Sequence, residues 1–406
     1  MNVFRFIPVC IAITILGACQ NAPNVLQDTP LSTEQSATES IITGAERLET
    51  YLPLLEGKSV AVVANATSII GDQHLVDTLL EKNIRVQKVF APEHGFRGQK
   101  DAGETVNDEI DVQTGLPIHS LYGSNKKPSS ELLSGLDVVV FDIQDVGVRF
   151  YTYLSTLHYV MEACAENDIP LIVLDRPNPN GFYIDGPVLK PEFSSFIGLH
   201  PVPLVYGMTI GEYGQMINGE GWLKNGVRCD LTVIKLEGYT HKSYYTLPVK
   251  PSPNLPNMNS VYLYPSLALF EGTSVSIGRG TAFPFQVIGH PDYPIKDFSF
   301  TPLPVSGAMF PKLEGQLSHG VDLRTSEASA ATAKSQLSLD WMIDFYTQLP
   351  DQDNFFLTNN FFNKLAGNNA LMQQIKSGLS ADEIRASWQS DLSAFRAIRQ
   401  NYLLYK

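Results

Sequence analysis

The chain has 406 residues, of which 42 are acidic and 29 basic, and its formal net charge is −13. This balance does not provide the basic face that nucleic acids bind, so we exclude nucleic acid as a partner. About 365 residues follow the N-terminal segments described next, which is enough for two domains with ordinary hydrophobic cores.

The N-terminus has the pattern of a bacterial lipoprotein signal. A short segment with one positive charge precedes an apolar run, Phe6 to Leu16, that is too short to span a bilayer. The run ends in Leu16-Gly17-Ala18-Cys19, which resembles the lipobox. We predict a signal peptide over 1–18, a lipid anchor on Cys19 and a cell-envelope location, with Gln20 favouring the outer membrane or periplasm. The alternative is an ordinary secretory signal with a chance cysteine.

The next segment is polar. Residues 19–41 contain no aromatic residue and cannot bury enough apolar surface to order themselves, so we predict a flexible tether there. No later stretch approaches twenty apolar residues. Cys164 and Cys229 lie in apolar helical and strand-like patterns, which indicates two buried free thiols.

Apolar strand patterns alternate with helical patterns through the following part of the chain. Short apolar strands separated by helices predict a parallel sheet covered on both faces. We therefore expect an α/β fold with a Rossmann-like, mostly parallel sheet domain over 42–295. The predicted strands are 59–64, 86–90, 136–142, 170–175 and 231–236, and the predicted helices are 74–82, 153–166 and 210–222.

Several nucleotide and hydrolase motifs are missing from the sequence. The first predicted strand is followed by Asn65-Ala-Thr-Ser-Ile69 instead of G-x-G-x-x-G, and no P-loop, H-E-x-x-H or G-x-S-x-G occurs. We therefore predict no nucleotide and no cofactor, and exclude an α/β-hydrolase and a zinc protease of the H-E-x-x-H type.

The C-terminal part, 296–406, has mixed polarity and is predicted to be a smaller α+β auxiliary domain, with a cleft between the two domains. It ends in a long predicted helix that Ser380-Ala-Asp-Glu383 opens with a capping-box pattern. The apolar stripe of this helix is interpreted as packing rather than as a ligand site. The stripe consists of Ile384, Trp388, Leu392, Phe395 and Tyr402.

Polar side chains collect where four consecutive predicted strands end. Ligands of open α/β sheets bind beyond the carboxyl ends of the strands, so we expect these side chains to form a site. Each one alone also has a structural interpretation, as a helix cap or an ion-pair partner. The residues that we expect to contact substrate are Asn65, His94, Gln144, Arg149, Tyr151, Tyr153, Arg176 and Asn178.

Glu93 is the strongest candidate for acid–base chemistry. It follows a proline at a strand end, beside His94 and Gly95, where a partly enclosed carboxyl can donate a proton. Paired carboxylates are the usual equipment of glycoside hydrolysis, and the candidates for the second one are Glu104, Asp142 and Asp145. The residues thus predict a hydrolase of the cell envelope that acts on sugars.

Long motifs in the chain resemble the exo-β-N-acetylmuramidase (NamZ-type) family. The resemblance runs from about Ile42 to Lys406. Its motifs include Phe90–Gly98 (FAPEHGFRG), Asp101–Glu104 (DAGE), Val140–Tyr153 (VFDIQDVGVRFYTY), Asp175–Gly181 (DRPNPNG), Pro251–Pro256 (PSPNLP), Leu269–Thr273 (LFEGT), Gly278–Thr281 (GRGT) and Tyr402–Tyr405 (YLLY).

This resemblance implies release of N-acetylmuramic acid from the non-reducing end of peptidoglycan fragments, with Glu93 as general acid. The second group is then Glu104, Asp142, Asp145 or the substrate's own acetamido group. Arg149, Arg176 and Arg279 are candidates for binding the lactyl carboxylate, and Asn254 and Glu271 for lining the cleft from its other side.

Other functions remain open at the level of the sequence. A glycan-binding lipoprotein needs the same polar cleft but no proton donor. An amidase or esterase needs a Ser or Cys nucleophile with a His, and no such arrangement is visible. The spacing of Asp142, Asp145 and His94 matches no recognised metal motif, so we predict no metal.

Overall fold

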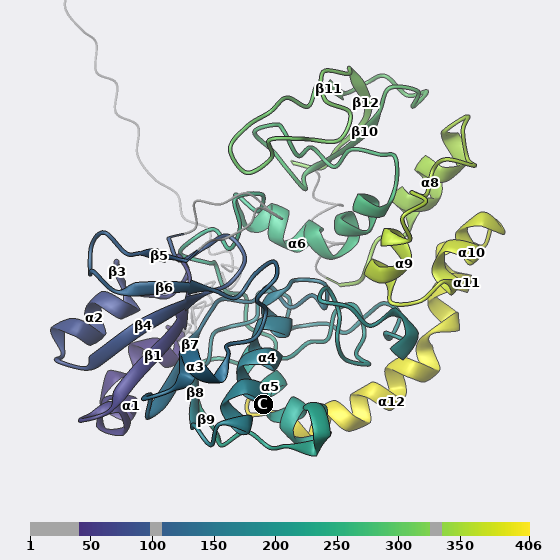
Figure 1. Cartoon of the computed structure of the whole chain (residues 1–406). Helices are drawn as coiled ribbons and strands as arrows, with labels where there is room; N and C mark the ends of the chain where they lie inside the picture. The colour runs from purple at the N-terminus through teal and green to yellow at the C-terminus, as the bar shows by residue number, and fades with distance from the viewer. Residues whose placement is uncertain (1–39, 98–107, 325–334) are drawn as a thin grey trace, which may run out of the picture. The chain divides into compact units, whose positions relative to one another are not determined.

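The computed structural model describes residues 40–97, 108–324 and 335–406. A seven-stranded sheet in the order β5-β6-β4-β1-β7-β8-β9 organises its first half, and its neighbouring strands are parallel except for β5 and β6 (Figure 1). This arrangement confirms the predicted α/β fold. The strands are β1 (Ser59–Ala64), β4 (Arg85–Ala91), β5 (Glu109–Ile110), β6 (Pro117–Ser120), β7 (Val138–Asp142), β8 (Leu171–Leu174) and β9 (Leu231–Ile234).

Helices cover both faces of this sheet because alternate strand residues point to opposite sides. Val60 and Val62 of β1 pack in one core with α1 (Leu48–Leu55) and α2 (Leu75–Glu81). Ala61 and Val63 pack in the other core, which includes α4 (Tyr153–Glu166) and α5 (Ile210–Gly219). A short helix, α3 (Ser130–Leu133), adds Leu133 to this second core. A small hairpin, β2 (Ile69–Ile70) with β3 (Gln73–His74), follows β1.

Residues after β9 add a second, smaller group of elements. A three-stranded antiparallel sheet has the order β10-β12-β11, and helices follow it to the C-terminus, which lies beside α5 in Figure 1. The elements are α6 (Met258–Leu267), the 3₁₀ turn η4 (Ala268–Gly272), β10 (Val287–His290), β11 (Ser299–Phe300), β12 (Ser318–Asp322), α8 (Asp340–Gln348), α9 (Phe361–Ala366), α10 (Ala370–Lys376), α11 (Ala381–Ser387) and α12 (Gln389–Arg399).

One predicted element is corrected. The single long C-terminal helix is two helices, α11 and α12, because Trp388 leaves the helical conformation at φ −106° and ψ 2°. The capping box of Ser380 and Glu383 is present at the start of α11. Ile384, Trp388 and the other stripe residues before Tyr402 are buried, which confirms their packing role.

The two groups of elements share one hydrophobic core. Residues 40–406 form a single compact unit, and its larger core cluster extends from Ala61 to Phe395. Cys164 and Cys229 are free and buried, as predicted. Within the described ranges, no helix has the length and apolar character that crossing a membrane requires.

Candidate active site

A cavity of about 990 Å³ contains residues from both parts of the chain. Its charged lining side chains include two carboxylates, Glu93 and Glu271, and two cations, Arg279 and Lys312. Its aromatic lining residues are Tyr122, Phe150, Tyr151, Phe196, Tyr264, Phe285, Phe310 and Phe361. Apolar walls with a few charged groups are typical of a small-molecule site.

Glu93 lies in a tight turn directly after β4. His94 and Gly95 have positive φ values, 70° and 75°, and the N–H of Gly95 donates to the carbonyl of Pro92 at 3.0 Å. The hydroxyl of Thr152 donates to Oε2 of Glu93 at 2.7 Å, which fixes the carboxyl from the start of α4. Burial, followed by the neighbouring Glu93 carboxylate, raises the pKa of Tyr122. The turn therefore holds a half-buried carboxyl against hydroxyl groups in the cavity.

The opposite wall carries an ion pair. Nη1 of Arg279 donates to Oε1 of Glu271 at 2.6 Å, and about a quarter of each side chain is exposed. Arg279 lies between two glycines with positive φ, and a Cβ on Gly280 would lie 2.6 Å from Cβ of Pro311. The close approach of these loops thus requires glycine and positions the guanidinium.

Lys312 links several backbone carbonyls of this wall. Its ammonium group donates to the carbonyls of Phe270 at 3.0 Å, Glu271 at 3.4 Å and Thr273. These carbonyls belong to η4 and the residues after it, where a cation is favourable. Burial lowers the pKa of Lys312 to about 8. An ammonium has three N–H donors, so Lys312 supplies charge and holds the wall in place rather than binding a ligand directly.

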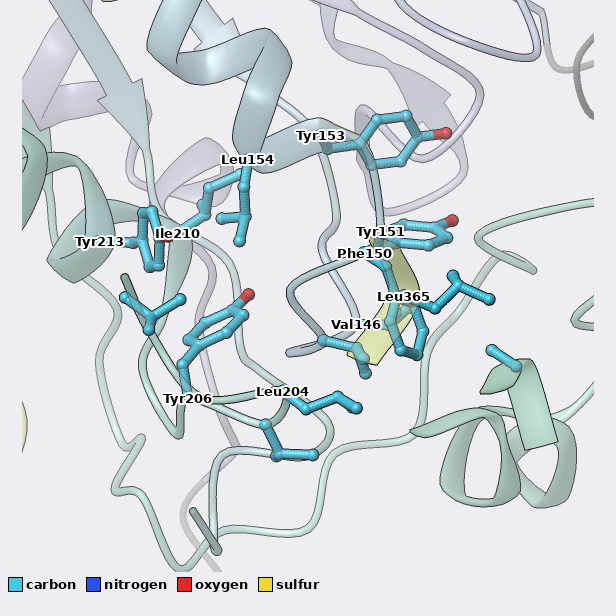
Figure 2. Packing of buried hydrophobic residues seen from close by; sticks show 14 of the residues in the cluster. Val146, Phe150, Tyr151, Tyr153, Leu154, Leu204, Tyr206, Ile210, Tyr213 and Leu365 are labelled. Carbon is cyan, nitrogen blue, oxygen red and sulfur yellow. The ribbon is translucent and has the colours of Figure 1, made fainter. Parts of the chain in front are cut away.

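Tyr151 and Asn254 line the same cavity with their polar ends bound to the backbone. The hydroxyl of Tyr151 donates to the carbonyl of Pro251 at 2.6 Å, and Nδ2 of Asn254 donates to the carbonyl of Gly307 at 2.7 Å. The ring of Tyr151 packs edge to face on Tyr153, with centroids 4.8 Å apart, and Figure 2 shows both hydroxyls pointing the same way. Tyr151 thus offers its ring rather than its hydroxyl to the cavity.

Other strand-end residues form a buried network away from the cavity lining. Asp142 and Arg176 make a two-pronged ion pair, with N–O distances of 2.6 and 2.8 Å, and at most 2% of each residue is exposed. Nδ2 of Asn65 donates to the hydroxyl of Tyr153 at 2.9 Å. These side chains satisfy one another, and we therefore reassign Asp142, Arg176, Asn65 and Tyr153 from direct substrate contact or catalysis to support of the sheet edge.

The buried network that supports the sheet edge also includes Asp145, Gln144 and Asn178. Asp145 accepts hydrogen bonds from the N–H of Gly147 at 2.6 Å and from the hydroxyl of Tyr206, and burial raises its pKa to about 6. Nε2 of Gln144 donates to the carbonyl of Pro177 and Nδ2 of Asn178 to that of Met208, both at 2.7 Å. The side-chain amides of Gln144 and Asn178 thus donate to the protein backbone rather than to a ligand.

Arg149 is a buried cation bound to backbone carbonyls. Its guanidinium donates to Pro187 and Val202 at 2.8 Å and to Leu365 at 2.9 Å. Burial lowers its pKa to about 9. Because Leu365 lies in α9 and lines the cavity, Arg149 fixes that wall from behind instead of binding the substrate carboxylate. Glu104 and Cys19 lie outside the described residues.

Comparison with known proteins identifies the family. The model of the N-terminal part of exo-β-N-acetylmuramidase NamZ matches residues 60–259, and the model of its C-terminal part matches residues 262–405. The chain belongs to the exo-β-N-acetylmuramidase NamZ family. The resemblance predicted from the motifs is confirmed.

Relatives of the NamZ family support this membership. The chain is 40% identical over 403 residues to the peptidoglycan β-N-acetylmuramidase NamZ of Bacillus subtilis (strain 168), covering 93% of this chain and 94% of that protein. Crystal structures of two DUF1343 family proteins from Bacteroides fragilis are also similar. Their TM-scores are 0.83 and 0.79 at 46% and 30% identity, and each match covers 90% of this chain and 99% of the other.

Sequence reasoning missed several residues of this NamZ-family site. Thr152 lies between two predicted ligands, Tyr151 and Tyr153, and directly before the predicted helix 153–166, so its position was a usable signal. Lys312 is a lone cation after the apolar run 308–311. Tyr122 and Phe310 carry no sequence signal beyond being aromatic. Among the described residues, no group of three or more His, Cys, Asp and Glu side chains could hold a metal ion.

Proposed function

We propose that this protein is an exo-β-N-acetylmuramidase that releases the non-reducing terminal N-acetylmuramic acid of peptidoglycan fragments. The observation that carries the proposal is the Glu93 carboxyl, held by Thr152 in a cavity whose other wall carries Arg279. Family membership and the relative named as a peptidoglycan β-N-acetylmuramidase support it.

Glu93 is the general acid in this proposal. It donates its proton to the glycosidic oxygen as the bond to the anomeric carbon breaks, so that the leaving sugar departs as a neutral alcohol. Asp142 is bound in its ion pair, and Asp145 is buried with Oδ2 bound to Gly147 and Tyr206. Neither lines the cavity, which makes both poor partners at the anomeric carbon. The second group is therefore Glu104 or the substrate's own acetamido oxygen.

Arg279 binds the lactyl carboxylate that distinguishes N-acetylmuramic acid from N-acetylglucosamine. Its guanidinium has five N–H donors, and the bond to Glu271 uses one of them. Arginine binds carboxylates through parallel hydrogen bonds, which gives geometric selectivity as well as attraction. Glu271 then orients the guanidinium.

Glu93→Gln tests the acid role. On the disaccharide N-acetylmuramyl-β-1,4-N-acetylglucosamine, we expect kcat/KM of residues 40–406 to fall at least about a hundredfold. On a dinitrophenyl β-muraminide, the loss should be far smaller because that leaving group needs no proton. The matched glucosaminide should be a poor substrate throughout.

Glu56→Gln is the matched control, because Glu56 is exposed and lies outside the cavity lining. Equal losses of Glu93→Gln on both muraminides would reject a proton-donor role. If the unaltered protein cleaved neither muraminide but still bound the disaccharide, it would be a glycan-binding protein instead.

We also propose that the protein is exported and anchored in the cell envelope by lipid on Cys19. The Leu16-Gly17-Ala18-Cys19 motif supports this location, and it would bring the enzyme to its polymer. In cells fed a labelled fatty acid, the full-length protein should carry label and fractionate with membranes. Cys19→Ser should abolish the label; a labelled Cys19→Ser protein would contradict the assignment.

A further inference from the structure

The loop between β11 and β12 exposes an unusual set of apolar side chains. Phe310 is 92% exposed, Leu303 54% and Met309 50%. Phe310 and Met309 also line the cavity, so they stand at its open edge. Exposed apolar side chains that adjoin a cavity indicate a surface that binds a ligand or a partner.

This loop is held in place at several points. Val305 and Ala308 exchange two backbone hydrogen bonds, of 3.2 and 2.9 Å, which close a tight turn. The carbonyl of Gly307 accepts from Asn254, and the N–H of Leu303 donates to the carbonyl of Gly280 at 2.9 Å. Phe310 is therefore presented by a constrained loop, and binding to it costs little ordering of the backbone.

The cavity also has room beyond the reacting sugar. Its volume of about 990 Å³ lies at the top of the range for small-molecule sites, ~300–1,000 Å³, and exceeds what one amino sugar needs. In an exo-acting enzyme, only the terminal sugar is enclosed, and the rest of the chain leaves through the open edge. The sugar on the leaving side of the bond therefore lies at the open edge, where Phe310 and Met309 are exposed.

We propose that Phe310 and Met309 form the binding site for the leaving-side sugar, with the ring of Phe310 against the apolar face of N-acetylglucosamine. This inference rests on the proposed function. An aromatic ring presents a flat apolar face that matches the axial C–H groups of a β-linked pyranose. A neutral, apolar contact is also compatible with N-acetylglucosamine, because this sugar lacks the lactyl carboxylate that Arg279 binds.

Phe310→Ala tests the proposal by the ratio of two kcat/KM values. One substrate is N-acetylmuramyl-β-1,4-N-acetylglucosamine, and the other is methyl β-N-acetylmuraminide, which has no leaving-side ring. The ratio should fall about tenfold in the variant, which corresponds to one aromatic contact. Leu317→Ala is the matched control, since Leu317 is 55% exposed nearby but does not line the cavity. Its ratio should stay unchanged.

Each outcome decides between distinct interpretations. An unchanged ratio in a folded Phe310→Ala protein would overturn the leaving-side site while leaving the muramidase intact. Cleavage of neither substrate by the unaltered protein would reject the proposed function itself. Sedimentation of residues 40–406 with phosphatidylethanolamine–phosphatidylglycerol vesicles, lost in Phe310→Ala with no change in the ratio, would make the loop a membrane contact and overturn the proposal.

Discussion

At the scale of single residues, the ion pair of Arg279 and Glu271 leads to a specificity prediction. Arg279→Met should lower kcat/KM for an aryl β-muraminide about 10- to 100-fold, the size of a lost charge-assisted hydrogen bond. Residual cleavage of the aryl glucosaminide should not change, because that sugar has no carboxylate. Both rates are measured by aryl release.

Arg324→Met provides the control for Arg279. Arg324 also pairs with a carboxylate, Asp322, at 2.6 Å, but neither residue lines the cavity. Its replacement should leave both rates unchanged. Equal losses on the two sugars in Arg279→Met would mean that Arg279 supports the cavity wall rather than the lactyl group.

The sequence predicts which loops build the site. It predicts less well which side chains of those loops enter the site. Glu93, His94 and Tyr151 line the cavity, whereas Asp142 and Arg176, from equally promising loops, bind each other and are not part of its lining. A polar residue at a strand end can point to a ligand or to its neighbour, and its identity does not decide the direction. Lys312 approaches Glu271 only through tertiary contacts, so no local spacing reveals it.

At the scale of elements, the last residues of the chain are tied to the sheet. The hydroxyl of Tyr405 donates to Asp175 at 2.5 Å, and the N–H of Leu404 donates to Glu212 of α5 at 2.7 Å. Burial raises the pKa of Asp175 to about 7, against an ordinary value of 3.8. The stability that this carboxyl contributes is therefore complete below about pH 4 and is lost as the pH rises through 7.

Tyr405→Phe should consequently destabilise the protein more at pH 8 than at pH 5. The lost bond is to a carboxylate at pH 8, about 1.5–3 kcal/mol, and to a neutral acid at pH 5, about 1 kcal/mol. Urea unfolding at both pH values measures the difference. Tyr402→Phe is the control, because its exposed bond to Glu220 should contribute about 0.5 kcal/mol or less. Equal losses for Tyr405→Phe at both pH values would contradict an ionising Asp175.

Elements with a strong local pattern were the most predictable part of the fold. β1 and α4 have the predicted bounds, since a β-branched run and a helical apolar stripe are local features. The sequence around Trp388 contains no Gly or Pro that would predict a break. The two helices that meet there pack by tertiary contact. Local patterns thus identify elements but not interruptions imposed by packing.

At the scale of the whole molecule, the two parts matched by the family models complete each other. Arg149 binds Leu365, Asp175 binds Tyr405, and the larger core cluster contains residues from both parts. Residues 40–406 should therefore unfold in one cooperative transition, monitored by far- and near-ultraviolet circular dichroism. Residues 40–261 alone should not give a stable fold, since buried charges would lose their partners. Two separate transitions would contradict this coupling.

The strands of the large sheet are not synthesised in the order in which they lie side by side. β1 is the first strand of the large sheet to be made, yet it lies between β4 and β7. Val60 pairs with Val138, 78 residues further along, so a β-branched strand stays open on that side while the next segments emerge. Contacts this distant in sequence form slowly, and an open apolar strand is prone to aggregate. The central strand of the large sheet is therefore the segment of the sheet that the nascent chain must protect longest.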